Sequence, residues 1–296
     1  MDQAEQLRKM MQQTNSKPKA KVITVTSGKG GVGKTNLSLN LAIHLSRLGK
    51  KVVVFDADFG LANIEVMLGV RPQYNLADMM FRGKELTDII TQGEEGIKFI
   101  SGGSGIQELA SMNREQVIFL TSRLLALDNY ADIIIVDTGA GISDSVLEFV
   151  LASTEVLLVA TPEPTSITDA YALLKALNRK AEFSKEDTSI KMISNRVKND
   201  AEGMSLYEKM SIVADKFLSI PITYVGSVPM DEQMSKAVMR QKPISVLYPD
   251  APASKAIKKI AERILEIQTE EQTEGWGLSH MFSNLIRNKM IKKSKK

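Results

Sequence analysis

Short apolar segments alternate with longer segments of helical periodicity along most of this chain. Seven runs are rich in Val and Ile and predict β-strands: Lys21–Ser27, Lys51–Ala57, Ile97–Ser101, Asp132–Asp137, Glu155–Thr161, Ile190–Asn195 and Ile222–Val228. Several are apolar at almost every position, as is typical of strands buried on both faces. Between the first two strands, leucines recur at helical spacing and a glycine follows them: Leu37, Leu41, Leu45, Leu48 and Gly49. The pattern predicts a doubly wound α/β fold with a mainly parallel sheet of seven or eight strands.

The strand pattern indicates one main domain, residues 19–268, with an additional segment at each end. In residues 1–18, Ala4, Leu7 and Met11 share one helical face and precede the helix-breaking stretch Thr14–Pro18. A short helix of this kind is marginal without a surface to pack on, and a frayed end is the alternative. Residues 269–275 are polar and acidic, which is typical of a linker, and residues 276–296 follow it.

Composition excludes several classes of protein and of site. The 296 residues are 43% hydrophobic and 25% charged, which is ordinary for a globular protein. No run approaches the roughly 20 apolar residues of a membrane span, and no signal-peptide core opens the chain, so we expect a cytoplasmic protein. The absence of Cys excludes disulfides, thiol catalysis and cysteine-ligated metal, and only two His argue against a histidine metal site.

The net charge of +3 is unevenly distributed along the chain. Residues 276–296 contain six cationic side chains and no carboxylate: Arg287, Lys289, Lys292, Lys293, Lys295 and Lys296. Residues 1–275 therefore carry a net charge of −3. The basic character belongs to the C-terminal segment and not to the main domain.

A phosphate-binding motif directly follows the first predicted strand. Residues 28–35 fit G-x-x-x-x-G-K-[ST] at a strand-to-helix junction, where backbone amides and the helix N-terminus can hold phosphate oxygens. We expect Lys34 to bridge the β- and γ-phosphates of a nucleotide and the Thr35 hydroxyl to ligate Mg²⁺. The expected phosphate cradle consists of Gly28, Lys29, Gly30, Gly31, Val32, Gly33, Lys34, Thr35 and Asn36.

Carboxylates stand at the ends of two further strands. Asp56 and Asp58 point the same way if the segment is extended, because side chains alternate with a period of two. Asp137 ends the fourth predicted strand, at the sheet edge where α/β proteins bind ligands. Any one of them could merely cap a helix, but three carboxylates beside a phosphate loop suit Mg²⁺ and its waters. Phosphoryl transfer needs positioning and charge, so no nucleophilic Ser or Cys is required.

Lys29 adds a second lysine to the loop, and KGGVGKT resembles the deviant Walker A motif of the MinD/ParA/nitrogenase-reductase-like ATPases. The resemblance implies an ATP-dependent, face-to-face homodimer in which Lys29 reaches the phosphates of the facing subunit; a solvated loop lysine is the alternative. It also implies that Asp58 orients or deprotonates the attacking water. Asp56 and Asp137 would act through Mg²⁺, and Gly139 would sense the γ-phosphate. The lack of Cys excludes the iron–sulfur branches of that family.

The adenine pocket is less determined by the residues. An Asn amide offers the donor and acceptor pair that the edge of adenine can use, but Asn195 could equally cap a helix. The family resemblance favours Asn195 as the adenine contact. It places Val228, Pro229 and Asp231 in the wall of the pocket.

Four segments narrow the resemblance to the flagellar MinD-like ATPases (the FlhG group): SGKGGVGKTN, DADFGLAN, DTGAGISDSV and EPTSITDAYALLKALNR. Asn36 replaces the second Thr common in MinD and ParA loops and fits this group. The first residues look like its DQAxxLR activator motif: Asp2, Gln3, Ala4, Leu7 and Arg8. The resemblance implies stimulation of the FlhF GTPase, contact with flagellar switch-ring (C-ring) proteins, and control of flagellar number and placement. A MinD-like cell-division ATPase, a ParA-like DNA-partitioning ATPase and a non-hydrolysing ATP-dependent scaffold are the alternatives.

The C-terminal segment has an apolar stripe at helical spacing, made of Leu278, Met281, Phe282, Leu285 and Ile286. Trp276 precedes the stripe, and Lys289 interrupts it but can extend its amine to the surface. An apolar face followed by lysines predicts a helix that lies reversibly in an anionic membrane surface, here the inner face of the cell membrane. A helix docked on the main domain is the alternative. The scarcity of aromatic residues among the lysines argues against nucleic-acid binding.

Overall fold

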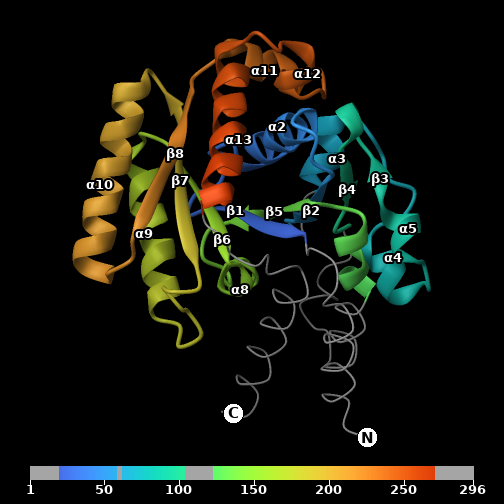
Figure 1. The fold of residues 1–296 in the computed structure, drawn as a ribbon, viewed down its shortest axis with the longest axis horizontal. Helices are drawn as coiled ribbons and strands as arrows, with labels where there is room; N and C mark the ends of the chain where they lie inside the picture. Colours follow the sequence, from blue (N-terminus) through green and yellow to red (C-terminus); the bar gives the residue numbers. More distant parts are fainter. Residues whose placement is uncertain (1–19, 59–61, 104–122, 271–296) are drawn as a thin grey trace, which may run out of the picture.

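The computed structural model describes residues 20–58, 62–103 and 123–270 (Figure 1). All seven predicted strands are present, with ends that differ from the prediction by at most three residues. The strands are β1 (Lys21–Ser27), β2 (Val52–Ala57), β3 (Thr91–Gln92), β4 (Lys98–Ile100), β5 (Ile133–Ala140), β6 (Glu155–Ala160), β7 (Ser189–Val197) and β8 (Ile222–Pro229).

Helices connect the strands in the alternation that the sequence predicts. The α-helices are α2 (Lys34–Arg47), α3 (Asn63–Leu68), α4 (Leu76–Phe81), α5 (Leu86–Ile89), α8 (Asp144–Ala152), α9 (Pro164–Asn178), α10 (Asp200–Leu218), α11 (Glu232–Met239), α12 (Ile244–Leu247) and α13 (Pro252–Glu270). Two short 3₁₀ segments are η1 (Glu94–Gly96) and η2 (Leu125–Asn129). Helix α13 continues to Glu270, so the first two residues of the predicted linker are helical.

The strands form one sheet in the order β3-β4-β2-β5-β1-β6-β7-β8. Every neighbouring pair is parallel except β3 with β4. The doubly wound, mainly parallel α/β fold is therefore confirmed, with eight strands among the described residues. The eighth, β3, has only two residues and carries no periodic signal in the sequence.

Helices cover both faces of the sheet, which explains the nearly continuous apolar strands (Figure 1). On β1, Ile23 and Val25 join the hydrophobic cluster that contains α2 and α13, whereas Val22 joins a cluster on the other face. Helices α8, α9 and α10 form a further cluster against β6 and β7. Almost every residue of the central strands β1, β2 and β6 is therefore buried whichever way it points.

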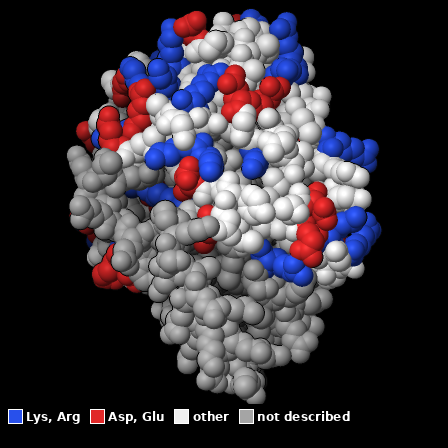
Figure 2. All heavy atoms as spheres, turned by 45° about the vertical axis from the view of Figure 1, so that its right-hand side comes forward, with Lys and Arg blue, Asp and Glu red and all other residues white. Residues whose placement is uncertain are grey.

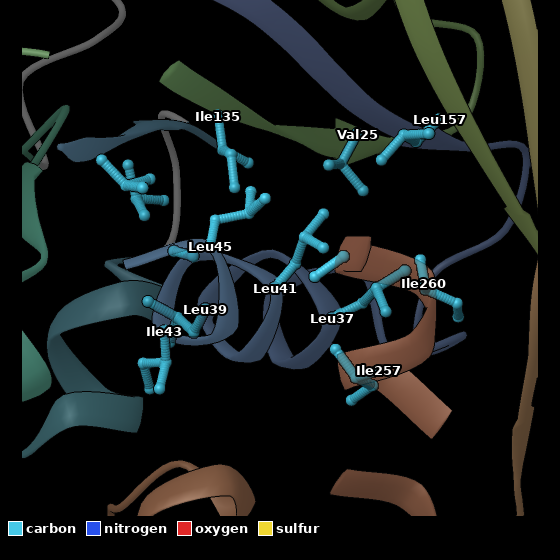
Figure 3. Packing of buried hydrophobic residues seen from close by; sticks show 14 of the residues in the cluster. Val25, Leu37, Leu39, Leu41, Ile43, Leu45, Ile135, Leu157, Ile257 and Ile260 are labelled. Carbon is cyan, nitrogen blue, oxygen red and sulfur yellow. The ribbon is translucent and has the colours of Figure 1, made fainter. Parts of the chain in front are cut away.

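Helix α2 is fixed against the sheet by the predicted leucine stripe. Leu37, Leu41 and Leu45 are at most 2% exposed. Figure 3 shows Leu45 beneath Ile135 of the sheet and Leu37 beside Ile257 and Ile260 of α13. Leu48, the last leucine of the pattern, is the C-terminal cap of α2 and is 39% exposed. Because α2 begins at the end of the glycine loop, this packing also fixes the loop's position.

Charges on the described surface are mixed. Figure 2 shows Lys and Arg side chains interspersed with Asp and Glu on one face of the molecule. Across the described ranges, none of the helices combines the length and apolar character that crossing a membrane requires.

Candidate nucleotide-binding site

The glycine loop lies at the carboxyl end of β1, which is a central strand between β5 and β6. Gly31 and Gly33 have φ angles of 75° and 95°, which an L-residue with a side chain adopts only with strain. A Cβ atom on Gly28 would lie 2.0 Å from the backbone oxygen of Asp169 in α9. These glycines let the loop turn tightly and approach α9, as phosphate binding by backbone amides requires.

Lys34 lies at the start of α2, inside the loop. Its Nζ donates a hydrogen bond to the Ser27 hydroxyl at 3.0 Å. Burial lowers the pKa of Lys34, while the carboxylates of Asp137 and Asp58 act in the opposite direction. A largely buried ammonium beside a phosphate cradle is placed to bind anionic oxygens.

Asp56 and Asp137 are adjacent across the sheet, because they are register partners on β2 and β5. They are 1% and 0% exposed, and among the described residues the Oδ2 atom of each has no hydrogen-bond partner. Burial, together with the nearby carboxylate of Asp137, raises the pKa of Asp56 to about 8. Burial also raises the pKa of Asp137 to about 6.

Two hydroxyl groups partly satisfy Asp137. Ser38, one turn after Lys34 on α2, donates to its Oδ1 at 2.8 Å, and a hydrogen bond from Thr35 also lowers its pKa. The predicted metal residues Thr35, Asp56 and Asp137 thus come together. Two buried carboxylates with free oxygens beside a hydroxyl are a donor set that suits Mg²⁺. Sequence analysis missed Ser38, although its spacing of four and three residues from Lys34 and Thr35 places it on the same helix face.

Asp58 lies beyond the end of β2, beside the carboxyl end of β5. Its Oδ2 accepts a hydrogen bond from Asn63 at 3.0 Å, and its backbone N–H donates to Asp56 Oδ1 at 3.1 Å. A Cβ atom on Gly139 would lie 3.3 Å from Asp58 Oδ1. The predicted catalytic carboxylate and the predicted γ-phosphate sensor are therefore neighbours.

Lys29 is bound within its own chain. Its Nζ lies 2.6 Å from Glu163 Oε2 and 2.7 Å from Thr165 Oγ1, at the start of α9. The side chain of Lys29 is 32% exposed and that of Glu163 is 55% exposed, so this ion pair lies at the surface. Sequence analysis missed Glu163 and Thr165 as site residues. Their EPTS segment was noted only as a family signature.

Asn195 contacts the glycine loop from β7. Its Nδ2 donates to the carbonyl oxygen of Val32 at 2.6 Å, and its Oδ1 accepts from the Arg196 backbone. The cap of the following helix is Asn199, which accepts a hydrogen bond from Glu202. The alternative that Asn195 caps a helix is therefore wrong, because α10 starts five residues later, at Asp200.

The other predicted adenine-pocket residues have structural partners of their own. Val228 is 2% exposed and belongs to the hydrophobic cluster around α2 and α13. Pro229 ends β8 opposite Val197. Asp231 caps α11 through the Gln233 amide at 2.8 Å, and its other oxygen accepts from the amide of the second residue of α13 at 3.1 Å.

Two predicted sets lie outside the described residues. They are the membrane residues Trp276, Leu278, Met281, Phe282, Leu285, Ile286 and Lys289, and the activator residues Asp2, Gln3, Ala4, Leu7 and Arg8. Within the described ranges, no cluster of three or more His, Asp or Glu forms a metal site. The candidate cation site thus depends on two carboxylates together with hydroxyl groups.

Comparison with known proteins agrees with this geometry. Residues 19–265 match the ParA family model, described as NUBPL iron-transfer P-loop NTPase. The chain is 42% identical to the antiactivator FleN of Pseudomonas aeruginosa over 254 residues, which covers 86% of this chain and 89% of FleN. It is 35% identical to the flagellum site-determining protein YlxH of Helicobacter pylori over 291 residues, which covers 92% of each chain.

Solved structures show the same fold. A MinC:MinD cell division complex from Aquifex aeolicus gives a TM-score of 0.65 at 28% identity, and covers 83% of this chain and 96% of that chain. MinD of Pyrococcus horikoshii, complexed with Mg-ADP, gives 0.67 at 22% identity, and covers 86% and 100%. The cysteine-free composition separates this chain from iron-transfer chemistry that uses thiolate ligands.

Proposed function

The chain belongs to the ParA and MinD family of P-loop ATPases, and from this premise we propose that it is an ATP-switched homodimer that regulates the number and placement of flagella. The observation that carries the proposal is the convergence of Lys34, Asp56 and Asp137 at the carboxyl edge of the sheet. The 42% identity to FleN and the 35% identity to YlxH support the flagellar role.

Hydrolysis of ATP needs positioned charge more than covalent chemistry. The loop amides and Lys34 hold the phosphates, and Thr35, Asp56 and Asp137 would hold Mg²⁺ with its waters. A Mg²⁺ held by these residues would supply positive charge that offsets the negative charge of the transferred phosphoryl group. Asp58 orients the attacking water and accepts its proton, and the adjacent Gly139 lets the carboxyl end of β5 approach the γ-phosphate.

ATP couples this site to dimerisation through Lys29. In the single chain the lysine pairs with Glu163 at the surface, where such contacts are weak and exchange easily. In the ATP-bound dimer Lys29 leaves Glu163 and reaches the phosphates of the facing subunit. Asn195 likewise holds the loop through Val32 and turns toward adenine when ATP binds.

The two end segments connect the ATPase to its surroundings. Residues 276–296 lie reversibly in the anionic inner face of the cell membrane through the stripe around Trp276 and Phe282. Residues 1–18 stimulate the FlhF GTPase through the motif that contains Leu7 and Arg8. The main domain contacts flagellar C-ring proteins. The apolar stripe, the lysine cluster and the DQAxxLR-like sequence support these assignments.

Asp58→Ala tests the catalytic assignment. We expect ATP binding to persist while phosphate release falls by about 10² or more, since a positioned acid–base group contributes about that much. Asp215→Ala on the exposed surface of α10 is the matched control and should hydrolyse ATP normally. Unchanged turnover in Asp58→Ala would remove this residue from catalysis. Absence of single-turnover phosphate release from the unaltered protein would instead identify a non-hydrolysing scaffold.

Co-sedimentation with anionic liposomes and with DNA, in the presence of ATP, tests the membrane assignment. The intact chain should sediment with liposomes and not with DNA, and removal of residues 276–296 should abolish liposome binding. DNA binding without liposome binding would favour the ParA-like alternative. A GTPase assay with purified FlhF and the Arg8→Ala variant tests the activator segment, and equal stimulation by both forms would contradict it.

A further inference from the structure

A groove runs along the outer side of the edge strand β8 and extends to Pro229, the one groove residue that is also a predicted adenine-pocket residue. Helices α10 and α13 flank β8 (Figure 1), and the groove encloses about 480 Å³. Its floor is formed by β8 from Tyr224 to Ser227 and by Ile260 of α13. Met204 of α10 lines it and is 42% exposed.

One wall of the groove is a cationic ridge on α13, made of Lys255, Lys259 and Arg263. These residues are four positions apart and therefore share one helix face. Lys255 pairs with the exposed Asp250 at 3.1 Å. Among the described residues, no carboxylate lies within 4.0 Å of Lys259 or Arg263. The ridge thus presents two cations without an acidic partner in the described structure.

The ridge costs the helix some stability, because like charges four residues apart repel each other. The same helix also contains an opposite-charge pair at this spacing, Lys258 with Glu262 at 3.8 Å. Lys258 thus has a carboxylate partner outside the groove, whereas Lys259 and Arg263, in the groove, have none among the described residues. This excess positive charge makes the groove face of α13 attractive to anions.

A carboxylate on the opposite side of the groove determines how an anionic ligand is oriented. Asp200, the first residue of α10, accepts a hydrogen bond from Ser227 at 2.6 Å. Its carboxylate repels acidic groups there, while Met204 offers apolar contact nearby. Acidic side chains in the groove must therefore point toward α13.

The floor accepts a short extended chain and disfavours a long added strand. A Cβ atom on Gly226 would lie 2.9 Å from Ile260 Cγ1, so glycine allows α13 to pack closely against β8. The pairing of β8 with β7 shifts register between Met192 and Ile193, opposite this part of β8. Such an irregularity interrupts a strand's hydrogen-bonding edge, so side-chain charge rather than strand addition must provide recognition.

We infer that this groove binds an extended acidic segment of a partner protein. The rise of an α-helix places ridge cations about 6 Å apart. Alternate side chains of an extended chain are about 6.6 Å apart. Acidic residues at every second position therefore match Lys255, Lys259 and Arg263 in turn. The residues between them face Met204 and are apolar.

Fluorescence anisotropy with the full-length chain tests the inference. The probe is a fluorescein-labelled peptide, Gly-Glu-Val-Glu-Val-Glu-Gly, and the control peptide has Gln in place of each Glu. We expect the acidic peptide to bind and the Gln peptide to bind at least tenfold more weakly. The double variant Lys259→Gln, Arg263→Gln should lose at least tenfold in affinity for the acidic peptide. Lys258→Gln, an exposed change on α13 outside the groove lining, should stay within twofold.

Three outcomes would overturn the inference. They are no binding of the acidic peptide, equal binding of the two peptides, or an equal loss of affinity for the acidic peptide in the double variant and in Lys258→Gln. Equal displacement by a poly-dT oligonucleotide or by anionic vesicles would show a general anion surface and would also overturn it. Unchanged thermal unfolding and ATP turnover in the variants confirm that α13 remains folded. Neither residue of the double variant belongs to the nucleotide site.

Discussion

Lowering the pH from 7 to 5 should destabilise this protein through His44, and His44→Gln should remove that part of the loss. His44 is 4% exposed on α2, and its Nε2 lies 2.8 Å from Ser245 Oγ and 3.4 Å from Ser254 Oγ. Burial, together with the charges of Arg47 and Lys258, lowers the pKa of His44 from 6.5 to about 4. The folded protein therefore keeps this imidazole neutral at a pH where the unfolded chain protonates it.

The sign and the magnitude follow from proton linkage. Between pH 6.5 and pH 4 the unfolded chain binds a proton at His44 that the folded protein does not bind. The contribution of neutral His44 to the free energy of unfolding is therefore fully present above about pH 6.5 and is lost as the pH falls toward 4. A pH of 5 is about 1.5 units below the pKa of His44 in the unfolded chain. Since each pKa unit corresponds to about 1.36 kcal/mol, the free energy of unfolding at pH 5 is lower by about 2 kcal/mol. Salt screens the contribution of the surface cations, so we expect about 1–2 kcal/mol.

Urea unfolding at pH 7 and pH 5 measures this effect. The free energy of unfolding should fall by about 1–2 kcal/mol more in the unaltered protein than in His44→Gln. Other titrating groups, including Asp56 with its raised pKa, occur in both proteins and cancel in the comparison. Equal losses in the two proteins would refute the assignment of a neutral, buried His44.

Three further predictions concern the nucleotide site. Glu163→Gln should release Lys29 and strengthen ATP-dependent dimerisation in analytical ultracentrifugation; an unchanged or weaker dimer would contradict the competition between the two positions of Lys29. Asn195→Ala removes the hydrogen bond to Val32, worth about 1 kcal/mol, and should weaken ATP binding about five- to tenfold by calorimetry; unchanged affinity would exclude it from the pocket. Gly28→Ala places a Cβ atom 2.0 Å from a backbone oxygen of α9 and should abolish ATP binding or folding, as followed by nucleotide titration and thermal unfolding; wild-type behaviour would contradict the close approach.

The main chemistry could be predicted from the sequence because its signals are local. The glycine loop is contiguous, and Lys34 and Thr35 are part of its motif. Asp56 and Asp137 each end an apolar run, and the carboxyl ends of parallel strands meet at one edge. The structure shows that these two carboxylates are direct register partners on β2 and β5. The sequence pattern predicts only that they lie at the same edge of the sheet.

The partners of these residues could not be predicted, because they are distant in the chain. Lys29 lies 134 residues from Glu163, and the Val32 carbonyl lies 163 residues from Asn195. A helix-cap role for Asn195 is compatible with its position at the end of the predicted strand Ile190–Asn195. Only the observed start of α10 excludes that role and assigns the cap to Asn199.

The sequence by itself determined the order of strands and helices, the phosphate loop and the carboxylates that accompany it, because periodicity and glycine content act over a few residues. Tertiary structure alone decided the sheet order, the partner of Lys29 and the neutral state of His44. It also decided which face of α13 borders the groove beside β8. These features depend on which distant segments of the chain pack against each other. Burial and electrostatic interactions between such segments cannot be deduced from the residue pattern of one segment.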